Sequence, residues 1–385
     1  MSATADRDQG ERRELKALTS LRGLAAMAVV AAHYTATAQL ITKRVIPSLV
    51  PHGYVAVDFF FVLSGFIMCY TYLDSFERGR PGAYRDFLAR RVARILPLHV
   101  ALVLLLSLAA LVSIALIGHN IFFTVRHFWA LDLAANLLLL PGIGIGDNFN
   151  FPSWSIGTEF LAYFLFPVLV WIVFNKRPVM RFAGIAFAAA VLIAYAARTH
   201  RLLLGGPSGG EHIVRCLSEF TLGMAAFQMY RIPRLANVLA RDASALILSV
   251  LCMTSLSLRY DLPAALLFPF LVVAFAKNKG WPARFVELRP IYLLGVWSYS
   301  IYLIHSPFRA LALGAARSVF GPFVSPELAL LLAFLGCLAV IPFAWAGYTF
   351  IERPGRNFFR NRLAQNAKSH ASQMPGTAVG NSATL

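Results

Sequence analysis

Arg22 and His33 are the residues of this sequence whose types and spacing first suggest chemistry, and both lie in the apolar stretch 21–40. On an α-helix the eleven steps between them turn about 1100° and rise about 16 Å, so both side chains occupy the same face. An imidazole can take a proton from a hydroxyl near neutral pH, whereas a guanidinium binds phosphates. An ionisable residue inside a helix long enough to span a bilayer is costly and generally functional, so His33 is the first catalytic candidate.

Two carboxylates are candidates to assist His33. Asp58 in the run VDFFFVLSGF and Glu159 in WSIGTEF each lie a few residues into an apolar stretch that we expect to start at the outer surface. A carboxylate beside an imidazole fixes its tautomer and stabilises the imidazolium, which general-base catalysis needs. We therefore predict that Glu159 or Asp58 orients His33, the alternative being structural hydrogen bonds between helices. His305 in WSYSIYLIHSP falls near the same level, and for it we favour an interhelical or interfacial hydrogen bond.

Arg91 and Arg94 are spaced i,i+3 and share one face of a helix that enters the membrane from the cytoplasmic side, at the level of Arg22. Clustered guanidinium groups suit phosphates. The alternative is anchoring to lipid headgroups, to which we assign most other basic residues. This spacing would fit an amphiphilic acyl donor that binds these arginines with its phosphates. A long thin arm such as pantetheine would then reach towards His33. This pattern points to acyl-coenzyme A.

The composition predicts a membrane protein in which helices position these residues. Of the 385 residues 58% are hydrophobic and only 14% are charged, which is far more apolar than a soluble protein of this length. Apolar blocks of about 20 residues predict an all-α polytopic bundle of about ten transmembrane helices. The blocks cover residues 21–40, 54–73, 95–117, 154–174, 179–197, 213–230, 243–258, 262–276, 291–311 and 327–351. The shorter apolar segment 131–140 is expected to be interfacial or re-entrant.

The distribution of basic residues predicts the topology. Most Lys and Arg residues fall in segments that face the same side if the N-terminus is cytoplasmic, so we expect both termini to be cytoplasmic. The net charge of +17 then reflects topology and not nucleic-acid binding, because the basic residues are spread over short loops. We expect a cytoplasmic N-terminal segment at 1–20 that is not a cleaved signal peptide, one integral domain at 21–362 and a disordered cytoplasmic tail at 363–385.

The four cysteines all lie inside apolar blocks without CxxC spacing. This pattern predicts small packing residues, and it indicates neither a disulfide framework nor a metal site.

Several stretches of the sequence resemble the acyltransferase 3 family of bacterial integral membrane O-acyltransferases. Members of this family acylate exopolysaccharides, lipopolysaccharide O-antigens, nodulation factors and related glycans. The matching stretches are LTSLRGLAAMAVVAAHY, VDFFFVLSGFIM, RRVARILPLH, WSIGTEFLAYFLFP, WSYSIYLIHSP and ERPGR. The resemblance implies a ten-helix protein of the bacterial inner membrane. It would move an acyl group, usually acetyl, from cytoplasmic acyl-CoA to a hydroxyl of a surface or exported glycan or lipid-linked saccharide.

The resemblance also assigns roles to residues. It implies that His33 is the catalytic histidine and that Arg22, Arg91 and Arg94 hold or position the donor. Fused family members carry a second extracytoplasmic domain that completes the transfer. Because none follows Arg362 here, we expect the standalone type, close to the exopolysaccharide and nodulation-factor members. The sequence leaves open whether His33 is a base or carries the acyl group, and on which side of the membrane the acceptor is modified.

Two other classes of function fit part of the pattern. A proton-coupled secondary transporter or glycan flippase could use intramembrane His, Asp and Glu residues as a relay. The absence of a recognisable internal repeat and the cytoplasmic arginines aligned with His33 argue against it. A non-enzymatic membrane partner in a polysaccharide assembly complex would explain the helices but gives no reason for the aligned pair.

Overall fold

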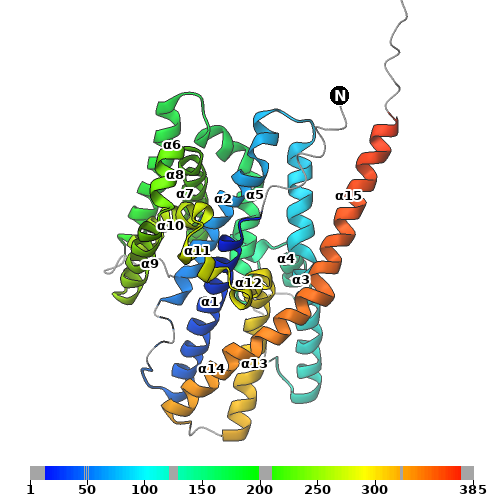
Figure 1. Cartoon of the computed structure of the whole chain (residues 1–385). Helices are drawn as coiled ribbons and strands as arrows, with labels where there is room; N and C mark the ends of the chain where they lie inside the picture. The colour runs from blue at the N-terminus through cyan, green and yellow to red at the C-terminus, as the bar shows by residue number, and fades with distance from the viewer. Residues whose placement is uncertain are drawn as a thin grey trace, which may run out of the picture.

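A computed structural model describes residues 14–46, 48, 50, 52–120, 129–198, 210–320 and 324–373. All regular structure in these ranges is helical, which confirms the all-α prediction (Figure 1). The long helices are α1 (Lys16–Thr42), α2 (Ala56–Glu77), α3 (Ala83–Ile117), α5 (Ser153–Val173), α6 (Pro178–Ala196), α7 (Gly210–Arg231), α9 (Asp242–Ser257), α10 (Asp261–Lys277), α13 (Ser298–Phe320), α14 (Pro326–Gly347) and α15 (Arg353–Gln373). The shorter ones are η1 (Gly53–Val55), α4 (Trp129–Leu137), η2 (Leu140–Ile143), α8 (Pro233–Leu239), α11 (Trp281–Val286), α12 (Arg289–Val296) and η3 (Tyr348–Glu352).

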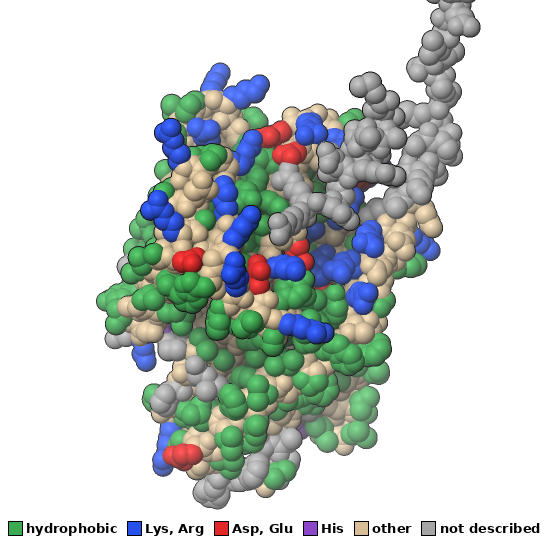
Figure 2. Space-filling view, in the orientation of Figure 1, with side chains coloured by type: hydrophobic (Ala, Val, Ile, Leu, Met, Phe, Trp, Pro, Cys, Tyr) green, Lys and Arg blue, Asp and Glu red, His purple; other side chains and the backbone are tan. Residues whose placement is uncertain are grey.

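The described helices support a membrane protein. Six helical segments are long and apolar enough to cross a bilayer, or seven if α8 and α9, bent by 67° at their junction, form one span. Each of the ten predicted blocks falls on helical structure, but the number of ten crossings and the cytoplasmic termini stay predictions. Figure 2 shows Lys and Arg side chains gathered over the upper half of one face, above a lower half that is largely hydrophobic. Such an apolar surface matches the hydrocarbon core of a bilayer.

Helix α1 runs through the middle of the bundle and packs on α2, α12, α13 and α14 (Figure 1). Small residues allow this close approach. A Cβ atom added to Gly23 would lie 2.3 Å from the backbone nitrogen of Gly295, and one added to Gly295 would lie 2.0 Å from the carbonyl oxygen of Thr19. Glycine is therefore needed on both sides of the α1–α12 crossing. This contact brings Arg22 to the junction of α12 and α13.

A second close crossing joins α2 to α7. A Cβ atom added to Gly65 would lie 2.0 Å from the carbonyl oxygen of Phe220, and one added to Gly223 would lie 1.9 Å from the carbonyl oxygen of Val62. Because backbone atoms stand at both positions, neither helix can rotate against the other without a clash. The crossing determines which side chains of α2 face α7.

The predicted helix 291–311 is broken at Trp297, between α12 and α13. The carbonyl of Gly295 accepts hydrogen bonds from the side chains of Arg22 and Ser298, at 3.0 and 2.8 Å. These side-chain donors satisfy a carbonyl at the C-terminal end of α12, as helix ends require. The break thus places a helix junction against α1.

Other helices begin or end at residues that differ from the predicted ones. Helix α3 begins at Ala83, twelve residues before the predicted block, so Arg91 and Arg94 lie inside a continuous helix. The predicted short segment 131–140 corresponds to α4 and the start of η2. Helix α15 continues through residues 363–373, which the sequence predicts to be disordered, and residues 374–385 lie outside the described ranges. Of the predicted N-terminal segment 1–20, residues 1–13 also lie outside them, and α1 begins at Lys16.

Candidate functional site

The three predicted arginines and Glu159 line one cavity of about 160 Å³. The cavity lies among α1, α2, α3, α5 and α13 and has an apolar side formed by α2. Its lining residues are Arg22, Val57, Phe60, Phe61, Leu63, Ser64, Ile67, Met68, Arg91, Arg94, Ile95, Ser155, Ile156, Glu159, Tyr163, Ser298, Tyr299 and Tyr302. The structure thus brings together four side chains that come from three separate helices.

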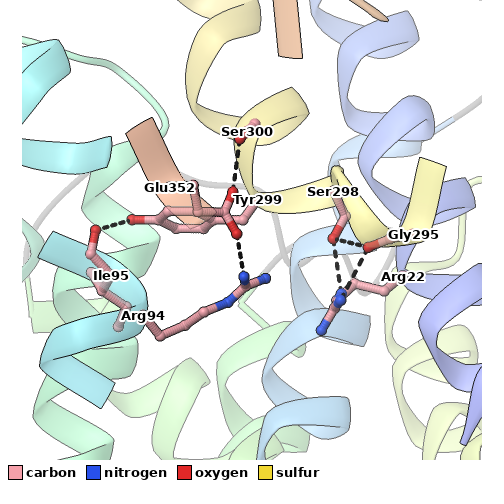
Figure 3. Close-up of polar contacts among 8 residues, drawn as sticks. All are labelled: Arg22, Arg94, Ile95, Gly295, Ser298, Tyr299, Ser300 and Glu352. Carbon is pink, nitrogen blue, oxygen red and sulfur yellow. Dashed lines mark hydrogen bonds and ion pairs between the residues drawn. The ribbon is translucent and has the colours of Figure 1, made fainter. Parts of the chain in front are cut away.

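Arg22 is held by uncharged partners. Its Nε donates to the hydroxyl oxygen of Ser298 at 2.8 Å, and its Nη2 donates to the carbonyl oxygen of Gly295 at 3.0 Å (Figure 3). Neither partner offsets the positive charge. The guanidinium of Arg22 is therefore oriented at the cavity wall with its charge available to an anion.

Arg94 has its charge balanced by Glu352, with which it forms an ion pair. Glu352 is fully buried, and its second oxygen accepts a hydrogen bond from Ser300 at 2.7 Å. The guanidinium carbon of Arg94 lies 5.6 Å from the centre of the Tyr299 ring, and the Tyr299 hydroxyl donates to the carbonyl of Ile95 at 2.7 Å (Figure 3). These contacts hold Arg94 rigidly between α3, α13 and η3.

One N–H group of the Arg91 guanidinium donates no hydrogen bond to the described residues. Its Nη2 donates to the hydroxyl of Tyr72 at 2.8 Å, and its guanidinium carbon lies 5.3 Å from the centre of that ring. Its Nε is buried and has no hydrogen-bond partner among the described residues. Leaving a buried donor unpaired costs about 1–3 kcal/mol, more for a charged group. An acceptor group in the cavity would remove that cost, as expected at an anion-binding position.

Glu159 lies with the arginines and not with His33. Its carboxylate accepts a hydrogen bond from the Tyr163 hydroxyl at 2.5 Å, and that hydroxyl lies 3.0 Å from the Ser64 hydroxyl. One carboxylate in a cavity lined by three guanidinium groups lowers the net charge of the cavity without cancelling it.

His33 pairs with another histidine. Its Nδ1 lies 2.8 Å from Nε2 of His305 on α13, where His33 is half-buried and His305 is fully buried. The prediction that Glu159 or Asp58 orients His33 is therefore wrong. The interhelical hydrogen bond that we favoured for His305 is present, and its partner is His33.

The predicted shared face of Arg22 and His33 is confirmed by their partners. Arg22 reaches Ser298 at the start of α13, and His33 reaches His305 about two turns further along the same helix. Tyr302 lies between the two contacts. It lines the cavity, and its ring centre lies 5.9 Å from that of His305.

Asp58 belongs to a different cluster. Both of its oxygens accept hydrogen bonds from Arg215 of α7 at 2.5 Å, and both side chains are buried. Glu219 lies 4.0 Å from the same guanidinium. A buried carboxylate is costly unless it is paired with a cation, and Arg215 supplies one across the α2–α7 crossing. Asp58 thus has a structural partner and does not contact His33.

Several residues of the site were not found by sequence reasoning. Glu352 carried a signal, because it is an ionisable residue at the end of an apolar block and opens the ERPGR stretch. Arg215 also lies in an apolar block. Tyr72, Tyr163 and Tyr299 carried none, because tyrosine is common in membrane helices. Among the described residues, no three His, Cys, Asp or Glu side chains are arranged to hold a metal ion, and the four cysteines are buried free thiols.

Comparison with known proteins identifies the family. A family model described as an acyltransferase domain matches residues 15–349. The acyltransferase MdmB of Streptomyces mycarofaciens is 30% identical over 76% of this chain and 78% of its own length. A membrane-bound transacylase, BcsY of Komagataeibacter xylinus, is 26% identical over 86% of this chain and 84% of its own.

A longer relative is the peptidoglycan O-acetyltransferase OatA of Listeria monocytogenes. It is 23% identical over 92% of this chain, which spans 58% of that protein. No solved structure matches. Since the family model covers nearly the whole chain, including the arginine-lined cavity and His33, this chain belongs to the acyltransferase 3 family and is an acyltransferase.

Proposed function

We propose that this protein transfers an acyl group, with acetyl as the first candidate, from cytoplasmic acyl-CoA to a hydroxyl of a bacterial surface or exported glycan. One observation carries the proposal: Arg22, Arg91 and Glu159 line a cavity whose wall residue Tyr302 also contacts the His33–His305 pair. The cavity that we propose for the donor thus adjoins a histidine that can act on a hydroxyl. Relatives named as O-acetyltransferases support this reaction class.

The arginines differ in what they can do for the donor. Arg91 and Arg22 can bind phosphate or thioester oxygens of the acyl donor. Nε of Arg91 has no hydrogen-bond partner in the part of the chain that the structure describes, and the hydrogen-bond partners of Arg22 are uncharged. Arg94 is already paired with Glu352 and shapes the cavity. Three guanidinium groups against the carboxylates of Glu159 and Glu352 leave an excess positive charge, which suits the anionic CoA.

His33 would act on the acceptor. Its imidazole takes the proton of the acceptor hydroxyl while that oxygen attacks the thioester carbonyl carbon. The carbon–sulfur bond then breaks, and the CoA thiolate takes up a proton, so the products are an O-acyl ester and free CoA. An acyl-histidine at His33 would divide the same transfer into two steps.

The proposed setting is the bacterial inner membrane, with ten spans and both termini cytoplasmic. In that topology Arg22 is nearer the cytoplasm than His33, because α1 runs outward. The acyl group would then move from inside towards an acceptor, such as a lipid-linked saccharide, at the outer half of the bilayer. The surrounding membrane lipids contact the apolar outer surface of the bundle.

Transfer of acetyl label tests the proposal. Membranes containing the protein are incubated with acetyl-CoA labelled in the acetyl group, and label is measured in extracted glycan. We expect incorporation that falls roughly 100-fold or more in His33→Asn, the scale of a lost general base. The purified protein should also be stabilised thermally by acetyl-CoA. The absence of both transfer and stabilisation would refute the proposal and favour a transporter, because a pure transporter has no reason to bind acetyl-CoA. Stabilisation without any transfer would refute acetyl transfer to the extracted glycan.

A further inference from the structure

We propose that His305 is a positioning residue that sets the tautomer of His33, so that the proton of His33 lies on Nδ1 and its Nε2 carries the free lone pair. This inference rests on the proposed function, in which His33 takes the proton of the acceptor. It names the atom of His33 that does so. It also gives a buried histidine the role that a carboxylate has in many catalytic pairs.

The two rings meet edge to edge. Their planes differ by 17°, and their centres lie 5.1 Å apart, whereas the two nitrogens are 2.8 Å apart. The difference of about 2.3 Å is close to twice the distance from an imidazole centre to one of its nitrogens. Both nitrogens therefore lie on the line between the ring centres. A hydrogen placed between them points directly at the lone pair of its acceptor, which is the most favourable geometry for an N–H···N bond.

Only one proton fits between Nδ1 of His33 and Nε2 of His305. If His305 is the donor, a neutral His33 must carry its own proton on Nε2 and has no lone pair left for a hydroxyl. If His33 is the donor, its Nε2 is free to accept a proton. Base catalysis by neutral His33 therefore requires His305 to be the acceptor.

The surroundings of His305 favour this arrangement. When its Nε2 accepts, its remaining proton lies on Nδ1. The backbone groups of Ile301 and Tyr302, four and three residues back on α13, interact with this imidazole. Carbonyl oxygens can only accept, so they favour an N–H on this ring, although Nδ1 forms no hydrogen bond of normal geometry among the described residues. His305 itself is fully buried, whereas His33 is half-buried. His33 is thus the member of the pair that an acceptor can reach.

Contacts between α1 and α13 on both sides of the histidine pair hold the two rings in position. Arg309, one turn beyond His305, donates to the Thr37 hydroxyl of α1 at 3.1 Å, and the Tyr34 hydroxyl donates to the His305 carbonyl at 3.3 Å. The Arg22–Ser298 bond ties the same two helices at the other end. Because α1 and α13 are joined on both sides, the ring of His305 is a fixed support for His33, as positioning groups must be.

Two substitutions separate tautomer control from packing. In His305→Leu the acceptor is lost, and we expect kcat to fall by about 10–100-fold, the usual effect of removing such a support. The KM for acetyl-CoA and the thermal stabilisation by acetyl-CoA should stay within about twofold, because His305 does not line the cavity. In His305→Glu the carboxylate can only accept, and Arg309 four residues later provides a counter-charge. We expect that variant to recover most of the activity that His305→Leu loses.

A measurement independent of activity reads the tautomer directly. Protein labelled with ¹⁵N-histidine in lipid bilayers has nine histidines, and the His33 signals are assigned as those missing from His33→Asn. We expect a protonated Nδ1 and an unprotonated Nε2 for His33. A protonated Nε2, or wild-type kcat in His305→Leu, would overturn the proposal. If the wild-type protein transferred no acetyl group, the proposed function would fail while the ¹⁵N spectrum still decided the tautomer.

Discussion

Arg94 of α3 and Glu352 of η3 form an ion pair at the wall of the candidate donor cavity, in which Glu352 is fully buried and Arg94 is half-buried, although they are far apart in the sequence (Figure 3). Ser300 of α13 donates to the second oxygen of Glu352. The pair therefore joins three parts of the chain that surround the cavity. Removing Arg94 would leave the fully buried Glu352 carboxylate without a partner, which usually costs more than the intact pair contributes.

Breaking this pair should destabilise the fold. We expect Glu352→Gln and Arg94→Met each to lower the free energy of unfolding by about 3–5 kcal/mol, because each leaves an uncompensated charge. The double variant should lose clearly less than the sum of the two. Unfolding of the detergent-solubilised protein measures all three. Strictly additive losses would show that the two side chains do not interact.

Arg91 should control donor affinity. Arg91→Met removes a charged side chain that lines the cavity and whose buried Nε has no hydrogen-bond partner among the described residues. A hydrogen bond to a charged group contributes about 1.5–3 kcal/mol, so the Kd for acetyl-CoA should rise roughly 10–100-fold. Titration of thermal stabilisation with acetyl-CoA measures this. Arg85→Met on the same helix, at an exposed position outside the cavity, is the matched control and should leave the Kd unchanged.

Phe151 should affect the acceptor and not the donor. Its ring contacts that of His33 edge-on with centres 5.5 Å apart, and 53% of the residue is exposed. A sugar ring approaching His33 can pack against it, and an aromatic contact of about 0.5–1.5 kcal/mol predicts a two- to tenfold higher acceptor KM in Phe151→Ala.

Glycan titrations in the labelling assay, at fixed acetyl-CoA, give this KM. Phe187→Ala removes a different exposed ring, which lies on α6, and should leave the acceptor KM unchanged. A changed acetyl-CoA KM in Phe151→Ala would contradict an acceptor role.

Gly295 should tolerate no side chain. A Cβ atom there would lie 2.0 Å from the Thr19 carbonyl oxygen, so Gly295→Ala must separate α12 from α1. We expect a loss of about 1–3 kcal/mol in unfolding free energy, as for other overpacked interiors. Gly347→Ala is the comparison, because the atom nearest to its Cβ would be Cδ1 at the free end of the Ile304 side chain, at 2.6 Å, and not a backbone atom. Equal stability of the two variants would argue against this close crossing.

The shared face of Arg22 and His33 and the spacing of Arg91 and Arg94 could be predicted from the sequence. Both follow from the 3.6-residue period of a single helix, which no tertiary contact needs to supply. The apolar blocks likewise predicted the helices, because a bilayer-spanning length of apolar residues is a local property. The ends of helices were predicted less accurately. The break between α12 and α13 lies where the side chains of Arg22 and Ser298 donate to the Gly295 carbonyl, and Arg22 belongs to a distant part of the sequence.

The partners of these residues were decided by the tertiary structure. His33 meets His305, Asp58 meets Arg215 and Arg94 meets Glu352, and each partner lies on a different helix. Which side chains meet depends on the rotation and depth of packed helices, and a shift of a few ångströms selects another neighbour. The sequence by itself therefore determined the helices and the faces of their charged residues. Only the folded bundle decided which charges and imidazoles are paired, because pairing depends on distances between helices that no local pattern records.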